Sequence, residues 1–389
     1  MPRLFIFALL CWVWFFGLFA TICQARPSSV ASFRLAGKQS EAVRLTETNR
    51  SAGNPTIAWT GEHFIVAWND NRTEVGLVYF TIVDENGNKL LDDTLVSEHD
   101  DTFPSHSATI LLEQKGFRIT YFHKERVFST SFSASGERLY SSNIFFSSID
   151  MLSCRIRAFA GSIALSWTDL SDKRTMLNFG LLPPGSETLA EQDQIALSGG
   201  TTWVSASSLA VAGGRAGVAW TDNPGGLYQI YFRSFDKNGL TSTATVQVSN
   251  STEKAFSPFL RSAGDHFAVA WFDERDGNPE IYFSSFANEI PAEEVRVTKE
   301  AAGSYNPVLA WADGFWGLTW YDYRDGNSEI YFKRLSADGQ PIGDTRRLTS
   351  DDEASHSPAL VWAEDKFGLV WLDEQLDDNL EVYFMTLFP

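Results

Sequence analysis

Cysteine is scarce in this sequence, with three residues among 389. Cys11 and Cys23 fall in an apolar N-terminal segment that we expect to be removed, which leaves Cys154 as the one cysteine of the mature chain. An intramolecular disulfide is therefore excluded for that chain. Its stability must come from core burial, for which a composition that is 44% hydrophobic and 14% aromatic is sufficient. Cys154 itself, flanked by Leu152 and Ile156, is expected to be a buried core thiol.

The common hydrolase and nucleotide-binding motifs are also missing. The sequence holds no Gly-x-Ser-x-Gly nucleophile elbow, no His-Glu-x-x-His zinc pair and no Gly-x-x-x-x-Gly-Lys phosphate loop. Their absence argues against a hydrolase that works by those routes.

Positive charge is in deficit, because 31 Lys and Arg face 49 Asp and Glu for a formal net charge of −18. A polyanion would be repelled by such a surface, so nucleic acid is excluded as a partner. Cations, basic proteins and neutral glycans remain compatible with it. The charge could also serve solubility alone.

The N-terminus reads as an export signal. Leu4 to Cys23 is almost uninterrupted apolar sequence preceded by Arg3. We predict a signal peptide over residues 1–25, cleaved after Ala25, and a mature chain that is periplasmic, at the cell surface or extracellular. An uncleaved anchor is the alternative, because about 20 apolar residues span a bilayer. Membrane contact is expected only through this segment.

A Trp-x-Asp step that recurs roughly every 50 residues is the strongest signal in the chain. The first gap is twice as long, and Phe117–Tyr121 fills it as a degenerate copy. The clear copies are Trp68/Asp70, Trp167/Asp169, Trp220/Asp222, Trp271/Asp273, Trp320/Asp322 and Trp371/Asp373.

Each repeat unit predicts four short strands, most plainly over residues 305–349. Turn sequences separate them, such as Asp325-Gly326-Asn327 and Asp338-Gly339, with glycine where a positive φ is favourable. Four strands per unit are one propeller blade, and the stacked blades must bury the recurring aromatic residues. The sequence therefore predicts an all-β, seven-bladed β-propeller with four-stranded blades.

The two ends of the chain predict how the ring closes. The seventh unit, residues 357–389, has only three strands, and Glu41–Thr46 matches the outer strand Thr345–Thr349 of the sixth unit. We expect the N-terminal strand to complete blade seven and remove exposed edges. Residues 26–389 are then one domain. Blades two and three are irregular, through drift or because they form a site.

Two units carry a recognisable motif. Trp311–Phe315 with Asp322–Tyr331, and again Ala270–Phe283, resemble the WD40-like (PD40) repeat of the propeller in TolB-type periplasmic proteins. The chain departs from that pattern by lacking the Ser-Pro-Asp-Gly turn, by its longer blades and by having no α/β domain of the TolB kind. The resemblance implies an exported propeller used for protein contacts, although fold carries over better than function.

Charged residues follow the second strand in several blades. The pairs are Asp70/Arg72, Asp273/Arg275 and Asp322/Arg324. An Asp at a strand end can accept turn N–H groups, so structural capping is favoured over a charged functional ring. Asp276-Gly277-Asn278 and Asp325-Gly326-Asn327 resemble parts of a calcium loop, but further acidic ligands are lacking, so no metal or cofactor is predicted and calcium stays the one candidate.

Two histidines occupy equivalent places, His106 and His356, each in Ser-His-Ser at the start of an innermost strand. Both should lie near the central channel, where they could border a binding mouth, share a metal or merely enter their strands. The loops between blades would add acidic residues around that mouth: Glu98, Asp100, Asp101, Asp351, Asp352 and Glu353. Such a rim suits a cationic partner, and a solvated loop is the equal alternative.

Two functional hypotheses follow. The first is a non-catalytic exported scaffold that binds a protein or a glycan in a bacterial envelope. The rival is a carbohydrate-active enzyme at the channel mouth near His106 and His356, which would need two carboxylates flanking a sugar. The Ser-x-Asp-x-Gly-x-x-Trp box of sialidases, which are also propellers, does not occur in the sequence.

Overall fold

The structure is a computed structural model, and it describes residues 38–48, 50–73, 75–98, 104–124, 126–145, 151–171, 174–186, 188–198, 204–240, 244–375 and 379–389. The predicted signal peptide, with its anchor alternative, and the acidic residues Asp100 and Asp101 lie outside these ranges. Within them, no helix has both the length and the apolar character needed to cross a membrane.

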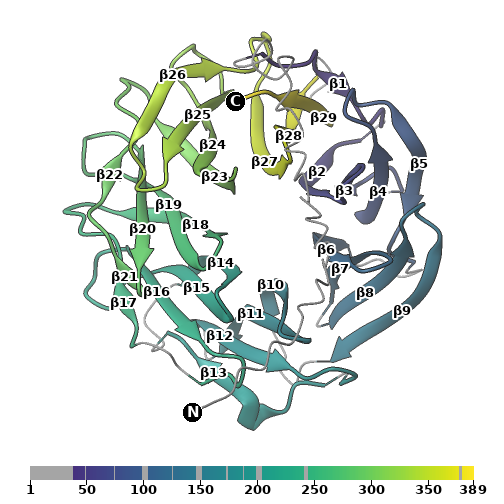
Figure 1. The fold of residues 1–389 in the computed structure, drawn as a ribbon, viewed down its shortest axis with the longest axis horizontal. Coiled ribbons are helices and arrows are strands. Elements are labelled where there is room, and N and C mark those ends of the chain that lie inside the picture. The colour runs from purple at the N-terminus through teal and green to yellow at the C-terminus, as the bar shows by residue number, and fades with distance from the viewer. Residues whose placement is uncertain are drawn as a thin grey trace, which may run out of the picture. The chain divides into compact units, whose positions relative to one another are not determined.

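Seven antiparallel sheets stand around a central axis, as Figure 1 shows, which confirms the predicted all-β, seven-bladed propeller. Blades one to six each run outward in chain order. Blade one has β2 (Ala52–Trp59), β3 (Phe64–Asp70), β4 (Leu77–Val83) and β5 (Lys89–Leu95); blade two has β6 (Ser105–Glu113), β7 (Gly116–His123), β8 (Arg126–Ser133) and β9 (Arg138–Phe145); blade three has β10 (Met151–Phe159), β11 (Ser162–Ser171), β12 (Arg174–Leu182), the 3₁₀ helix η1 (Glu191–Asp193) and β13 (Gln194–Ala196).

The second half of the ring repeats this order. Blade four has β14 (Ser205–Ala212), β15 (Arg215–Asp222), β16 (Gln229–Phe235) and β17 (Val246–Gln247); blade five has β18 (Ala255–Ala263), β19 (His266–Asp273), β20 (Glu280–Ala287) and an outer strand in two pieces, β21 (Ile290–Pro291) and β22 (Val295–Arg296); blade six has β23 (Ser304–Trp311), β24 (Phe315–Asp322), β25 (Glu329–Ser336) and β26 (Pro341–Arg347); blade seven has β27 (Ser355–Ala363), β28 (Lys366–Glu374) and β29 (Leu380–Leu387).

The N-terminal strand β1 (Val43–Arg44) completes blade seven, as predicted. It pairs antiparallel with β29, with Val43 opposite Phe384. The fully buried Glu381 carboxylate accepts hydrogen bonds from Arg44 Nη2 at 2.8 Å and from the Thr46 hydroxyl. In blade six, Glu329 makes the same contacts with Arg347 and Thr349 of its own outer strand, so β1 reproduces the chemistry of an ordinary outer strand.

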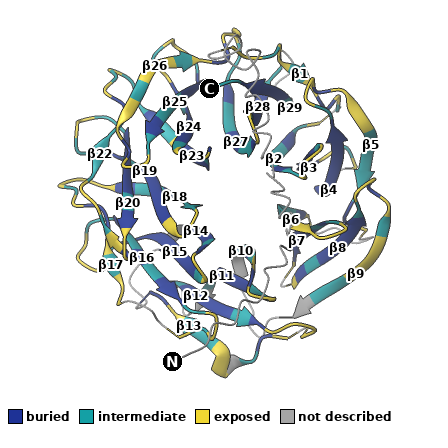
Figure 2. Ribbon diagram, in the orientation of Figure 1, coloured by how far each residue is buried: buried dark blue, intermediate teal, exposed yellow. Residues whose placement is uncertain are grey.

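The core consists of aromatic and branched side chains between blades. Figure 2 shows burial concentrated on the middle strands, and every residue of β3 and β4 is buried. The tryptophans of the six Trp-x-Asp steps are at most 1% exposed. Cys154 is buried as well, and burial raises the pKa of its thiol to about 12, which leaves the thiol unreactive at neutral pH.

Glycines on second strands allow neighbouring blades to approach closely. A Cβ atom on Gly368 of blade seven would lie 2.4 Å from the Phe64 ring of blade one. A Cβ atom on Gly317 would lie 2.5 Å from the Phe367 ring. The phenylalanine ring of one blade therefore packs directly on the glycine backbone of the preceding blade. Any side chain at the glycine position would occupy the space that the phenylalanine ring needs.

The inner strands share a bulge near their starts. The pairing register of β2 slips between Gly53 and Thr56, and the same slip occurs in β6, β18, β23 and β27. The bulged residues have φ values between 47° and 59°, a left-handed conformation that is uncommon outside glycine. They are Asn54, Ser107, Ser257, Asn306 and Ser357, and all five line the central channel.

Candidate binding site at the mouth of the central channel

One side of the ring carries both the turns between second and third strands and the connections between blades, and we call it the connection face. The Asp-Gly-Asn turns hold the connections in place there. Asn327 Nδ2 donates to the carbonyl oxygens of Asp351 at 3.0 Å and Glu353 at 2.6 Å. Asn278 does the same for the next connection, at Glu300 and Ala302.

The Asp and Arg at the ends of the second strands of blades one, five and six form a brace within the protein. Asp322 accepts hydrogen bonds from Trp320 Nε1 at 3.2 Å, from the Ser304 hydroxyl at 2.7 Å and from the backbone and side chain of Arg324. The Arg324 guanidinium lies 4.2 Å above the Tyr331 ring. Equivalent braces are Trp68/Asp70/Arg72/Tyr79 and Trp271/Asp273/Arg275/Tyr282. These contacts fit structural capping.

The braces of blades four and seven lack the arginine. Asp222 accepts the N–H of Asn223 at 2.8 Å. Asp373 accepts hydrogen bonds from Trp371 and Ser355, but Gln375 stands where the arginine would be. Burial without a cationic partner raises the pKa of Asp373. At Asp322, burial also favours the neutral acid, but the bonds from Arg324 and Ser304 outweigh it and lower the pKa.

The residues considered for calcium are engaged in contacts within the protein. Asp276 accepts hydrogen bonds from the Tyr282 hydroxyl at 2.5 Å and from Arg296 at 2.7 Å. Asp325 accepts one from the Tyr331 hydroxyl. No group of three side chains suited to a metal ion occurs among the described residues.

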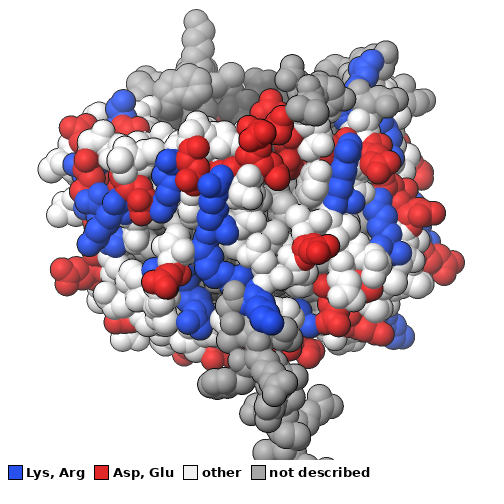
Figure 3. All heavy atoms as spheres, turned by 90° about the horizontal axis from the view of Figure 1, so that it is seen from above, with Lys and Arg blue, Asp and Glu red and all other residues white. Residues whose placement is uncertain are grey.

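The acidic residues predicted at the mouth lie on the connection face. Asp351 and Asp352 are exposed and Glu353 is half-buried, all in the connection that leads to β27. Glu98 pairs with Arg138 at 3.1 Å. On the flank of the molecule seen in Figure 3, acidic and basic side chains are interspersed rather than separated.

His106 and His356 occupy the same position in blades two and seven. Each is half-buried, and its Nδ1 lies about 3 Å from the hydroxyl of the following serine, Ser107 or Ser357. Burial lowers the pKa of both imidazoles. The two serines line the cavity at the centre of the ring, and each histidine lies one position before its serine, outside the set of residues that line the cavity.

Aromatic rings occupy the equivalent mouth position in blades five and six. Phe256 pairs across the strands with Phe272, and Tyr305 pairs with Tyr321. Their rings are in contact from one blade to the next: Tyr228–Phe256 at 5.1 Å, Phe256–Phe272 at 5.7 Å, Phe272–Tyr305 at 5.3 Å, Tyr305–Tyr321 at 5.6 Å and Tyr321–Tyr323 at 5.9 Å. We call these six residues the aromatic strip.

The tyrosines of the strip differ from the tyrosines of the braces. The Tyr282 and Tyr331 hydroxyls donate to Asp276 and Asp325, whereas no described residue hydrogen-bonds the hydroxyls of Tyr305, Tyr321 and Tyr323. Tyr323 is 46% exposed, and the other rings are half-buried. Burial, followed by the neighbouring tyrosines, raises the pKa of Tyr321 to about 12, so its hydroxyl keeps its proton.

Gly303 sets the position of the central ring of the strip. A Cβ atom there would lie 2.7 Å from the Tyr305 hydroxyl oxygen. The ring therefore lies over bare backbone, which orients it towards Tyr321 and Tyr323.

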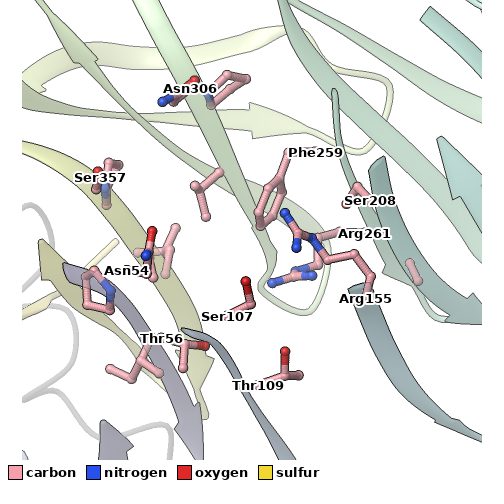
Figure 4. A pocket seen from close by; sticks show the side chains of 18 of the residues that line it. Asn54, Thr56, Ser107, Thr109, Arg155, Ser208, Phe259, Arg261, Asn306 and Ser357 are labelled. Atoms are coloured by element: carbon pink, nitrogen blue, oxygen red, sulfur yellow. The ribbon is translucent and has the colours of Figure 1, made fainter. Parts of the chain in front are cut away.

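Below the mouth, the inner strands of all seven blades enclose a cavity of about 660 Å³ (Figure 4). The described residues that line it include no Asp, Glu, His or Cys. Three arginines contribute the charge on its wall: Arg155 and Arg157 from β10 and Arg261 from β18.

The fold and this site define the chain as a seven-bladed β-propeller with an axial pocket and an aromatic mouth. No protein-family model matches the sequence, and no curated protein matches it. Among solved structures, a protein of unknown function from Dyadobacter fermentans shares 10% identity at a TM-score of 0.55, over 90% of this chain and 98% of that one.

Two enzymes share the fold. The phage phi92 endosialidase matches with 8% identity and a TM-score of 0.51, over 90% of this chain and 69% of that one. The Pyrococcus horikoshii acylaminoacyl peptidase matches with 10% identity and a TM-score of 0.54, over 88% of this chain and 52% of that one. This chain thus spans about half the length of the peptidase. At such identities the likeness shows the fold alone.

The aromatic strip and the channel arginines are the features that the sequence analysis missed. Aligning the repeats would have revealed the strip, because Phe256 and Tyr305 stand where His106 and His356 stand. For the channel, the sequence did offer one signal, since arginine residues occur within segments predicted as innermost strands.

Proposed function

We propose that this chain is an exported, non-catalytic binding propeller that holds a glycan at the mouth of its channel. The aromatic strip carries the proposal. A pyranose ring presents a face of C–H groups and a rim of hydroxyls. These match the half-exposed aromatic faces of the strip and its tyrosine hydroxyls, three of which no described residue hydrogen-bonds. A protein partner is the other candidate from the sequence, and no contact among the described residues favours it specifically.

Binding is favoured over catalysis by the composition of the channel. A glycosidase of the usual kind needs two carboxyl groups on either side of the sugar bond, and the described lining offers none. Export is inferred from residues 1–25, and the resemblance to PD40 repeats supports an envelope setting.

The test is binding of the purified full chain to an array of neutral oligosaccharides, followed by calorimetry on the best ligand. Tyr305→Ala and Tyr321→Ala should each weaken binding at least tenfold, since each removes one stacking surface. Tyr140→Ala is the matched control, because Tyr140 is 51% exposed on β9, away from the strip. Absence of any glycan ligand, or equal loss in the control, would refute the proposal. Cleavage of a bound glycan would favour the glycosidase instead.

A further inference from the structure

The three channel arginines lie at two levels along the inner strands, and we call each level a tier. Side chains two residues apart on a strand point to the same side, so Arg155 and Arg157 both face the channel from β10. Arg157 pairs with Ala164, three residues before Trp167, and Arg261 pairs with Ala268, three residues before Trp271. Arg157 and Arg261 therefore occupy the same tier of blades three and five.

Blade four carries small, buried side chains between these two arginines. Its residue in that tier is Ala210, which pairs with Gly217, three residues before Trp220. The tier above, where Arg155 lies, carries Ser208 in blade four. Small side chains thus separate the guanidinium groups, and in Figure 4 the side chains of Arg155 and Arg261 converge on one part of the cavity.

No carboxylate neutralises this cluster among the described residues. Arg155 and Arg157 donate only to the backbone oxygens of Cys154, at 3.2 Å, and Ile156, at 2.7 Å. Arg261 lies 4.4 Å above the Phe259 ring. The brace arginines at positions 72, 275 and 324, by contrast, each bond an aspartate. In a chain with a net charge of −18, three cations are gathered where no carboxylate of a described residue reaches them.

The surroundings make these charges costly. Burial, followed by repulsion from Arg155, lowers the pKa of Arg157 to about 10, and burial with repulsion from Arg157 lowers that of Arg261 to about 9. Arginine stays protonated at neutral pH even so. The three side chains are half-buried in the cavity wall, and a charge held partly out of water is stabilised by an ionic partner, so the cluster favours an anion from outside.

We propose that the channel binds an oxyanion, the carboxylate, phosphate or sulfate group of a small ligand, between Arg155 and Arg157 of blade three and Arg261 of blade five. Planar guanidinium groups bind such groups through paired hydrogen bonds. The cavity volume suits a small molecule. This site is separate from the aromatic strip and does not depend on it.

The test is calorimetric titration of the full chain with citrate, phosphate and sulfate, at an ionic strength held constant with sodium chloride. We expect saturable binding of at least one anion, and the arm with the lowest Kd identifies the group. The double variant Arg157→Gln/Arg261→Gln should bind at least tenfold more weakly. Arg334→Gln is the matched control, because Arg334 also lies over a phenylalanine, at 5.9 Å from Phe315, outside the channel. No saturable binding, or unchanged binding by the double variant, would overturn the proposal.

A second variant guards against misfolding of the first. Ala210→Glu places a carboxylate between the two guanidinium groups. It should raise the Tm of the unliganded protein and abolish the anion-dependent rise in Tm, because the site is then filled internally. A lower Tm with anion binding retained would contradict the assignment. Glycan binding at the aromatic strip should be unaffected in each of these variants.

Discussion

Blade seven carries Gln375 at the position where blades one, five and six carry an arginine. Gln375 Nε2 reaches Asp373 at 3.3 Å and the Tyr383 hydroxyl at 3.4 Å, so it fills the place of the guanidinium without its charge. Asp373 is consequently a buried carboxyl group whose raised pKa makes the folded protein take up a proton more readily than the unfolded chain. The folded state therefore gains stability as the pH falls through the raised pKa of Asp373 and loses that stability as the pH rises through it.

Gln375→Arg should restore the brace and stabilise the protein at neutral pH, by about 1.5–3 kcal/mol for a charge-assisted hydrogen bond. The gain should shrink in acid, where Asp373 is protonated. Denaturant unfolding at pH 7 and pH 4 measures both effects.

Arg324→Gln is the reverse change and should cost about 1–3 kcal/mol at neutral pH, since it leaves the buried Asp322 carboxylate without its cation. Because the pKa of Asp322 is lowered in the native brace, that stability is present at neutral pH and lost as the pH falls. Equal effects of the two variants at both pH values would contradict the role assigned to the brace arginine.

The strands and turns could be predicted from the sequence because short, local sequence patterns identify each of them. A Trp-x-Asp step lies at or near the end of the second strand in six blades, and a turn with glycine follows it in blades four, five and six. The match between Glu41–Thr46 and Thr345–Thr349 was enough to place β1. What the sequence could not show is which inner-strand side chains face the axis.

The bulges explain that failure. A strand alternates with a period of two, and one extra residue moves every later side chain to the opposite face. The slip between His356 and Ala359 is invisible in composition. Simple alternation along the inner strands therefore gave no reason to place Arg157 or Arg261 on the channel. The irregularity of blade three, which looked like drift or a site, coincides with two of the three channel arginines.

Contact between blades is set by the second-strand glycines. Gly368→Ala should destabilise the protein by about 1–3 kcal/mol, the usual cost of overpacking, because its methyl group would meet the Phe64 ring of blade one. Gly161→Ala is a useful comparison, since open space surrounds Gly161 and its cost comes from its φ of 84° alone. Thermal unfolding compares them. Rescue of Gly368→Ala by Phe64→Leu would locate the strain at the contact between the two blades.

At the scale of the whole molecule, β1 protects the outer edge of β29. A chain that begins at Arg50 would expose that edge, and an unpaired strand edge recruits other chains. We expect concentration-dependent association of this variant in light scattering, whereas a chain that begins at Lys38 should stay at the size of the full chain. If the shortened chain has the same particle size at all concentrations, the edge of β29 needs no strand paired with it.

The pairing of β1 with β29 also constrains the order in which the blades can fold. Arg44 and Glu381 lie 337 positions apart, so the residues of β1 are synthesised long before those of β29. Six blades can form from contiguous segments as they emerge, but the seventh waits for the last residues of the chain. Closing so long a loop is slow, and the unpaired N-terminal strand must be kept from wrong partners until then. Any factor that assists the folding of this protein would act in that interval, on a nearly finished ring whose first strand is still unpaired.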